Sequence, residues 1–135
     1  MDAPTARMRV LAERLFAEEA SSQAEPHPNV HQALRVFEKL RTSLTLFVGT
    51  DGFTALTRRA LALARAETAL LQGVTVQTNG SLLGFEDVAA QADNCGTEEA
   101  LALTSHVLSL LVTFIGESLT LRLVKDAWPD LSLDD

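Results

Sequence analysis

Residues 98–128 read EEALALTSHVLSLLVTFIGESLTLRLVKDAW and form the longest and most apolar segment of the chain. Apolar residues recur at helical spacing on two neighbouring faces of this segment. One face carries Leu101, Leu108, Leu111, Val112, Ile115, Leu119 and Leu123, and the other carries Leu103, Val107, Leu110, Phe114, Leu121 and Val124. A helix with two apolar faces is buried on two sides. We therefore expect one central helix, about 45 Å long, that ends near Trp128 because Pro129 cannot continue it.

The uncharged core of this segment, Ala100–Gly116, also suggests a membrane span. A span needs about 20 consecutive apolar residues, and this run is shorter. Polar side chains interrupt it at Thr104, Ser105, His106, Ser109 and Thr113. Glu117 then follows directly. The sequence therefore favours a buried helix of a soluble protein and predicts no membrane span.

Three more helices are expected upstream of this segment. The first covers about residues 4–20, and the second begins after Asn29, which with Gln32 forms a capping-box pattern. Its predicted buried stripe is Val30, Ala33, Leu34, Phe37, Leu40, Leu44 and Phe47. Gly49 ends the second helix, and a third runs from about residue 51 to Gln72.

Residues 74–84 change character, because Val-Thr-Val-Gln is β-prone and Asn79-Gly80 is a strong turn signal. The sequence predicts a small β-hairpin here, followed by a short helix over residues 85–92. A loop with two prolines covers residues 21–28, and an acidic tail covers residues 129–135.

These elements predict an all-α fold in a single helical domain, residues 1–135. Four principal helices form an antiparallel bundle, with the hairpin and the short helix inserted before the long C-terminal helix. A chain of 135 residues is long enough to bury a core without disulfides or metals.

Charge and cysteine content narrow the function. A net charge of −7 argues against a nucleic-acid partner, since phosphate binding needs a basic patch. Cys95 is the single cysteine, so no internal disulfide forms. The first residues lack the apolar region of a signal peptide. We expect a cytoplasmic protein, of the bacterial type.

Few side chains suggest chemistry. His27 and His31 have a zinc-like spacing, but His27 precedes Pro28 and no third ligand is nearby. Glu67 falls where the third helix should be apolar, so we expect a boundary residue paired with an arginine. No phosphate loop or catalytic triad pattern occurs. We expect no catalytic residue, no metal site and no cofactor.

His106 opens one alternative. The sequence Ser105-His106-Val107-Leu108 resembles the phosphoacceptor helix of histidine kinases and, more distantly, that of histidine phosphotransfer domains. The resemblance implies a phosphotransfer or signalling domain that uses His106. Val107 departs from the acidic base of the kinases, and Ser109 and Leu110 depart from the Lys-Gly pair of phosphotransfer domains.

A stripe of mostly small residues runs along the last helix and is the candidate interface. It consists of Ala102, His106, Ser109, Thr113, Gly116 and Thr120. Small residues let a neighbouring backbone approach closely. The neighbour is either the same stripe of a second subunit, about a two-fold axis, or the flank of the third helix formed by Ala62, Ala66 and Ala69.

The sequence therefore predicts a non-enzymatic helical protein–protein interaction module that forms a homodimer or binds another protein. The alternatives are the phosphotransfer domain just described and a binder of small apolar ligands between the helices.

Overall fold

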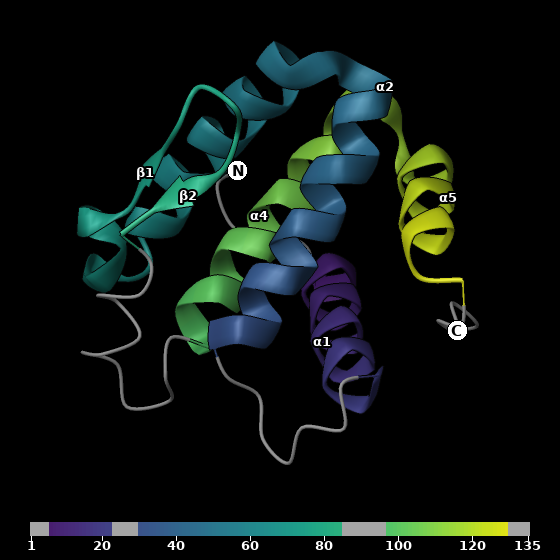
Figure 1. The fold of residues 1–135 in the computed structure, drawn as a ribbon, viewed down its shortest axis with the longest axis horizontal. Helices are drawn as coiled ribbons and strands as arrows, with labels where there is room; N and C mark the ends of the chain where they lie inside the picture. The colour runs from purple at the N-terminus through teal and green to yellow at the C-terminus, as the bar shows by residue number, and fades with distance from the viewer. Residues whose placement is uncertain (1–5, 23–29, 85–96, 130–135) are drawn as a thin grey trace.

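The computed structural model describes residues 6–22, 30–84 and 97–129, and in these ranges the chain is mostly helical with a small antiparallel sheet (Figure 1). The elements are α1 (Ala6–Ser22), α2 (Val30–Arg65), the 3₁₀ helix η1 (Ala69–Gly73), β1 (Thr75–Val76), β2 (Leu82–Leu83), α4 (Thr97–Ile115) and α5 (Glu117–Ala127). The short helix expected at residues 85–92 and most of the acidic tail lie outside the described residues.

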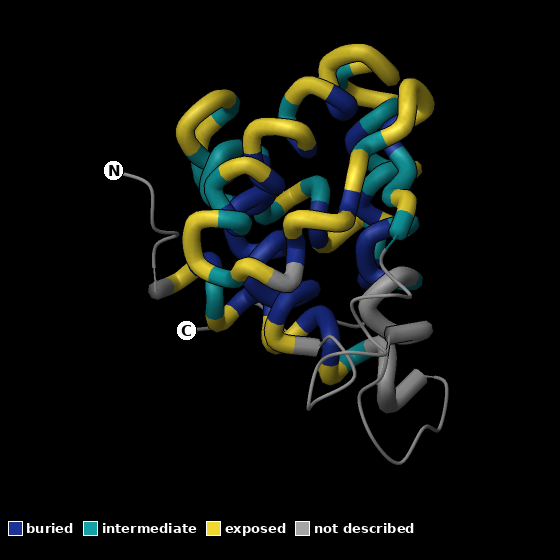
Figure 2. The backbone as a smooth tube through the Cα atoms, turned by 90° about the vertical axis from the view of Figure 1, so that its left-hand side faces the viewer, coloured by how far each residue is buried: buried dark blue, intermediate teal, exposed yellow. Residues whose placement is uncertain are grey.

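Helix α4 lies at the centre of the fold, against both α1 and α2 (Figure 1). Every residue from Glu99 to Leu108 is buried, which confirms the burial on two sides that the two apolar faces predict. Figure 2 shows the buried segments gathered inside the molecule and the exposed ones around them. Burial ends toward the last turn of α4, where Phe114 is 73% exposed.

The prediction of one continuous helix over residues 98–128 is wrong, because the helix breaks at Gly116. This residue has φ 92° and ψ 156°, a region that essentially only glycine adopts. The break lets α5 turn back beside the first half of α2 (Figure 1). There α5 buries Thr120 and Val124, and Trp128 after its end is also buried. The apolar pattern alone gave no sign of the break, since it continues through the glycine.

Helix α2 is kinked at Gly49, where φ is 84° and ψ is 162°. The predicted helix end at Gly49 therefore corresponds to a kink. The two halves of α2 pack on each other, and the ring centroids of Phe37 and Phe53 lie 5.7 Å apart. Their contact adds aromatic packing to the apolar burial.

The second half of α2 ends at Arg65, earlier than the predicted Gln72. The amide groups of Glu67 and Thr68 both donate to the Ala64 carbonyl, which closes the helix. The Arg65 guanidinium then donates to the carbonyl oxygens of Leu71 and Val74, beyond the helix end. These bonds hold the chain in a 3₁₀ turn where the periodicity predicted continued α-helix.

The predicted hairpin is confirmed, with Thr75 opposite Leu83 and Val76 opposite Leu82. The Gly80 amide donates to the Gln77 carbonyl at 2.9 Å, so the turn centres on residues 78 and 79. Gly80 follows with φ 87°, the positive value that favours glycine after such a turn.

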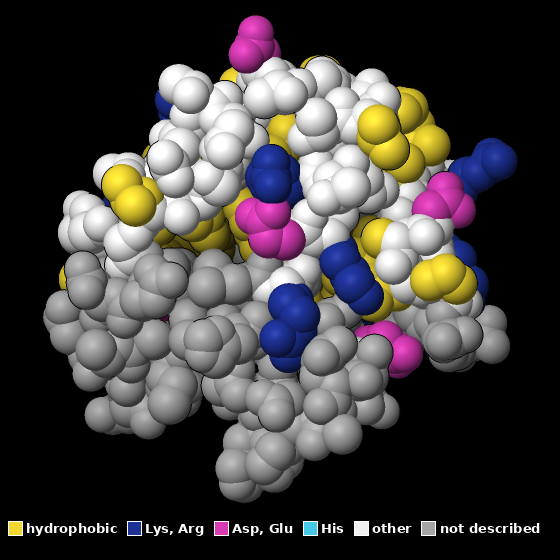
Figure 3. All heavy atoms as spheres, in the orientation of Figure 1, with side chains coloured by type: hydrophobic (Ala, Val, Ile, Leu, Met, Phe, Trp, Pro, Cys, Tyr) yellow, Lys and Arg dark blue, Asp and Glu magenta, His cyan; other side chains and the backbone are white. Residues whose placement is uncertain are grey.

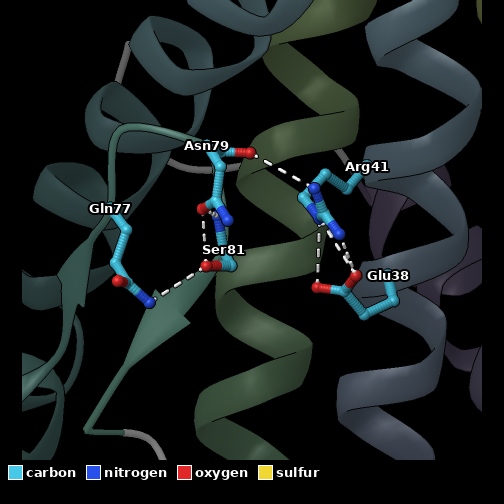
Figure 4. A network of polar contacts seen from close by, with 5 residues as sticks. All are labelled: Glu38, Arg41, Gln77, Asn79 and Ser81. Atoms are coloured by element: carbon cyan, nitrogen blue, oxygen red, sulfur yellow. Dashed lines mark hydrogen bonds and ion pairs between the residues drawn. The ribbon is translucent and has the colours of Figure 1, made fainter.

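The hairpin tip connects the two halves of α2. Arg41, in the first half, donates to the Asn79 carbonyl at 3.3 Å (Figure 4). Thr54, in the second half, donates to the Thr78 carbonyl at 3.3 Å. Gly80 is buried against Phe53, and a Cβ there would lie 2.8 Å from the Phe53 ring. The tip therefore fixes the angle between the two halves of the kinked helix.

Arg41 is itself held by Glu38, whose carboxylate accepts hydrogen bonds from its Nε and from a terminal nitrogen (Figure 4). This hydrogen bond raises the pKa of Arg41 above its usual value. The same guanidinium thus contacts both Glu38 and the hairpin tip.

Candidate interaction surface

A row of polar side chains lies inside the core along α4. His106 is 1% exposed, and its Nε2 atom contacts a carboxylate oxygen of Glu67 in the turn after α2. The prediction that Glu67 pairs with an arginine is therefore wrong in its partner. Glu67 leaves the helix because α2 ends at Arg65, and its carboxylate can then reach the ring.

Glu99 lies seven residues before His106, about two turns earlier on α4, and contacts the same turn after α2. It is 8% exposed, and one of its carboxylate oxygens accepts a hydrogen bond from Thr68 at 3.4 Å. Its second carboxylate oxygen has no hydrogen-bond partner among the described residues. Glu67, Thr68, Glu99 and His106 thus hold the turn after α2 against the central helix.

The surroundings of His106 in this polar row consist of contacts within the fold. In the ranges that the structure describes, no three His, Cys, Asp or Glu side chains converge as metal ligands. Ser105, next to the histidine, is fully buried and donates its hydroxyl to the Leu101 carbonyl at 2.7 Å. The hydroxyl is therefore engaged with the backbone of its own helix.

The predicted small-residue stripe is divided by the helix break. Ala102 and His106 are buried in the core, and Thr120 is buried on α5. The middle of the stripe is more accessible: Ser109 is half-buried, and Thr113 and Gly116 are exposed.

The internal neighbour proposed for the stripe does not form. A Cβ at Gly116 would meet no atom within 4 Å. Ala62, Ala66 and Ala69, which were the candidate flank, are exposed. Within the described chain, Gly116 is therefore needed for its backbone conformation, and no close packing restricts the space around it.

A group of large apolar side chains is exposed where α2 bends and α4 ends. Leu46 is 87% exposed, Phe47 48% and Phe114 73%. We call these three residues the apex cluster. The sequence analysis placed Phe47 and Phe114 on buried faces, which is wrong because the glycine breaks redirect the chain beside them. All three residues lie within three positions of Gly49 or Gly116, and this proximity to a glycine is the sequence feature that could have identified them as exposed.

Two hollows border the apex cluster. The α2–α5 hollow has a volume of about 670 Å³ and is lined by Glu38, Lys39, Thr42, Ser43, Leu46, Phe47, Leu123, Asp126 and Ala127. The α2–α4 hollow, of about 350 Å³, is lined by Val48, Gly52, Ala55, Leu56, Leu111 and Phe114. Figure 3 shows hydrophobic side chains gathered on the surface over the bend of α2, at the upper right. This end of the molecule therefore presents both protruding apolar side chains and depressions.

No protein-family model, no curated protein and no solved structure matches the chain. In the described ranges, the stretch Glu98–Ile115 is long and apolar enough to cross a membrane by length and composition. The fold buries 61% of this stretch, a pattern typical of a core helix.

Proposed function

We propose that the chain is a non-enzymatic helical interaction module that forms a homodimer through the apex cluster. The observation that carries the proposal is the exposure of Leu46, Phe47 and Phe114 at one end of the molecule. Burying a large apolar side chain fully contributes about 1.5–3 kcal/mol. Grouped side chains of this kind mark interaction sites, whereas scattered ones do not.

The shape of this end favours a second copy of the chain as the partner. A two-fold interface uses the same patch on both subunits, so each patch must carry both protrusions and depressions. Leu46 and Phe114 protrude, and the α2–α5 and α2–α4 hollows lie directly beside them. Lys39 and Asp126 both line the first hollow and carry opposite charges, which suits contact between two identical patches about a two-fold axis.

The proposal includes the antiparallel bundle of four principal helices, a cytoplasmic location and no membrane span. The burial of most of Glu98–Ile115 supports the last point, because a lipid-facing helix would present its apolar surface outward. Every residue from Glu99 to Leu108, in the first half of α4, is buried.

The phosphotransfer alternative is less well supported by the geometry. A phosphoacceptor histidine must offer a ring nitrogen to a phosphate donor. His106 is 1% exposed, and its Nε2 atom already contacts Glu67. Phosphorylation would require the turn after α2 to leave α4 first.

A small apolar ligand is the second candidate, and the α2–α4 hollow favours it. Its volume of about 350 Å³ lies at the lower end of the range of ligand pockets. Its lining side chains are all apolar. A fluorescent apolar probe such as anilinonaphthalene sulfonate separates the candidates: saturable one-to-one binding to a monomer favours a ligand site, whereas loss of probe binding as the chain associates favours the dimer.

The proposal is tested by charging the apex cluster. Phe114→Glu should yield a monomer with unchanged secondary structure, because a carboxylate in the interface would lose its hydration. Leu83→Glu is the matched control, since Leu83 is 58% exposed on the hairpin, and it should leave the molar mass unchanged. Equal dimerisation of Phe114→Glu and wild type in light scattering would contradict the proposed interface.

A further inference from the structure

Helices α4 and α5 are joined by a one-residue hinge. The apolar pattern of residues 98–128 is that of one helix, and only the dihedral angles of Gly116 divide it. A Cβ at this position would meet no atom within 4 Å. The surroundings therefore leave the space at Gly116 open, and a helical conformation there would join α4 and α5 into one straight helix.

Straightening would also restore hydrogen bonds. A helix end leaves its last carbonyl groups and its first amide groups without partners inside the helix. The break creates one such end on α4 and one such start on α5. In the bent state the Thr120 amide and hydroxyl both donate to the Gly116 carbonyl, at 3.1 and 2.8 Å. A continuous helix would supply partners for the remaining groups.

Side-chain contacts hold α5 in the bent position. Thr120, Val124 and Trp128 are buried, and the Lys39 Nζ lies 5.4 Å from the centre of the Trp128 ring. Glu117 at the start of α5 forms an ion pair with Arg7 of α1 at 2.5 Å. If α5 of another copy occupied the same position against α1 and α2, all of these contacts would form between the two chains.

We propose that two copies of the chain exchange α5 through a helical conformation of Gly116. In the exchanged dimer, α4 and α5 form one straight helix, and α5 of each chain packs against α2 of the other. Such exchange of an identical element is a low-cost route to a dimer, because the contacts that α5 makes are already present in the monomer. This inference rests on the proposed homodimer and identifies the element through which it forms.

The position of the apex cluster agrees with this exchange. Phe114 lies two residues before the hinge, and Leu46 and Phe47 lie beside the kink of α2 near α5. In an exchanged dimer the two straight helices pass each other at the hinge. The side chains exposed there in the monomer would meet their counterparts from the second chain.

The hinge is tested by Gly116→Ala. Alanine strongly disfavours a φ of 92°. The ratio of bent to straight conformations of each chain should therefore fall roughly fivefold or more. Two hinges are relieved in each dimer, so the association constant should rise about 30-fold or more over wild type. Sedimentation equilibrium under reducing conditions measures this constant and excludes disulfide dimers through Cys95.

Two control variants separate the hinge from general destabilisation. Gly49→Ala places the same side chain at a similar backbone conformation, also with no neighbour within 4 Å, but in α2. It should lower stability and should not raise the association constant, because the kink at Gly49 positions the apex cluster. Gly73→Ala also meets no atom within 4 Å, without a positive φ, and should change neither. A rise with Gly49→Ala as large as with Gly116→Ala would overturn the proposal.

The exchange itself is read from Trp128, the single tryptophan of the chain. Labelled and unlabelled Gly116→Ala chains are unfolded together, refolded and examined by isotope-filtered NMR. Contacts from Trp128 of one chain to Lys39 of the other support the exchange. A dimer with these contacts only inside each chain overturns the exchange and leaves the proposed homodimer standing.

The wild type could be a monomer while Gly116→Ala forms a dimer with interchain Trp128 contacts. This result supports the exchange and contradicts the proposed homodimer interface of the wild type. If the wild type and Gly116→Ala are both monomers, the exchange and the proposed homodimer are both overturned.

Discussion

The contact between His106 and Glu67 gives the sharpest prediction about stability, because one side chain is buried and the other is exposed. His106 is 1% exposed, whereas the side chain of Glu67 is 40% exposed. Glu67→Ala removes the partner of a buried ring nitrogen, and a buried polar group without a partner costs about 1–3 kcal/mol. In this variant, water can reach the ring nitrogen of His106 from the side on which Glu67 is exposed. We therefore expect a loss of unfolding free energy in the lower part of this range, about 1–2 kcal/mol.

The reverse change should cost less. In His106→Leu the Glu67 carboxylate is left without its partner, but it reaches solvent, and the leucine fills an apolar site. The double variant His106→Leu/Glu67→Ala should therefore be at least as stable as Glu67→Ala, because replacing both partners can be nearly neutral.

The assay is urea unfolding followed by circular dichroism, with melting as a second readout. At this chain length about 1 kcal/mol corresponds to a shift of roughly 4 °C in Tm. Glu38→Ala is the matched control, since Glu38 is a carboxylate in a half-buried pair with Arg41 near the surface, and surface pairs contribute about 0–1 kcal/mol. The reasoning is refuted if His106→Leu lowers the unfolding free energy more than Glu67→Ala does.

Two further predictions concern the hairpin tip. Gly80→Ala should destabilise the fold by about 1–3 kcal/mol, because its Cβ would lie 2.8 Å from the buried Phe53 ring. Urea unfolding measures this loss, with Gly73→Ala as the control. Equal stability of the two variants would contradict the packing of Gly80 on Phe53. Arg41→Ala should cost only about 0–1 kcal/mol in global stability but should speed amide exchange at Gly80, because the Asn79 carbonyl loses its bond to α2. Unchanged exchange at Gly80 would show that the tip holds without Arg41.

The sequence predicted the helical class, the hairpin and the central buried helix, because these follow from patterns of neighbouring residues. The two-sided apolar pattern of residues 101–108 corresponds to burial on all sides, and Asn79-Gly80 lies at the tip of the hairpin. These signals are local, so no tertiary contact was needed to read them.

The break at Gly116 could not be predicted in the same way. A glycine inside a helical pattern is compatible with a continuous helix, and the choice depends on whether α5 gains more by packing on α2. The burial of Val124 and Trp128 against the core decides it. The apex cluster was missed for the same reason, since it exists only because two helices change direction.

The partner of His106 was missed because the helix containing Glu67 was predicted seven residues too long. A glutamate in the turn after α2 can reach α4, and its pairing depends on the bonds that Arg65 makes to Leu71 and Val74. Such hydrogen bonds from a side chain to the backbone leave no periodic trace in the sequence.

Sedimentation equilibrium of the wild-type chain, over increasing concentration and under reducing conditions, measures directly whether the apex cluster is an interface. One chain has a mass of 14.6 kDa. We predict a mass that rises from this value toward twice this value and stays at 14.6 kDa for Phe114→Glu. A wild-type mass that remains 14.6 kDa up to about millimolar concentration, the range in which even weak association with a free energy of about −4 kcal/mol becomes visible, would contradict the proposed homodimer.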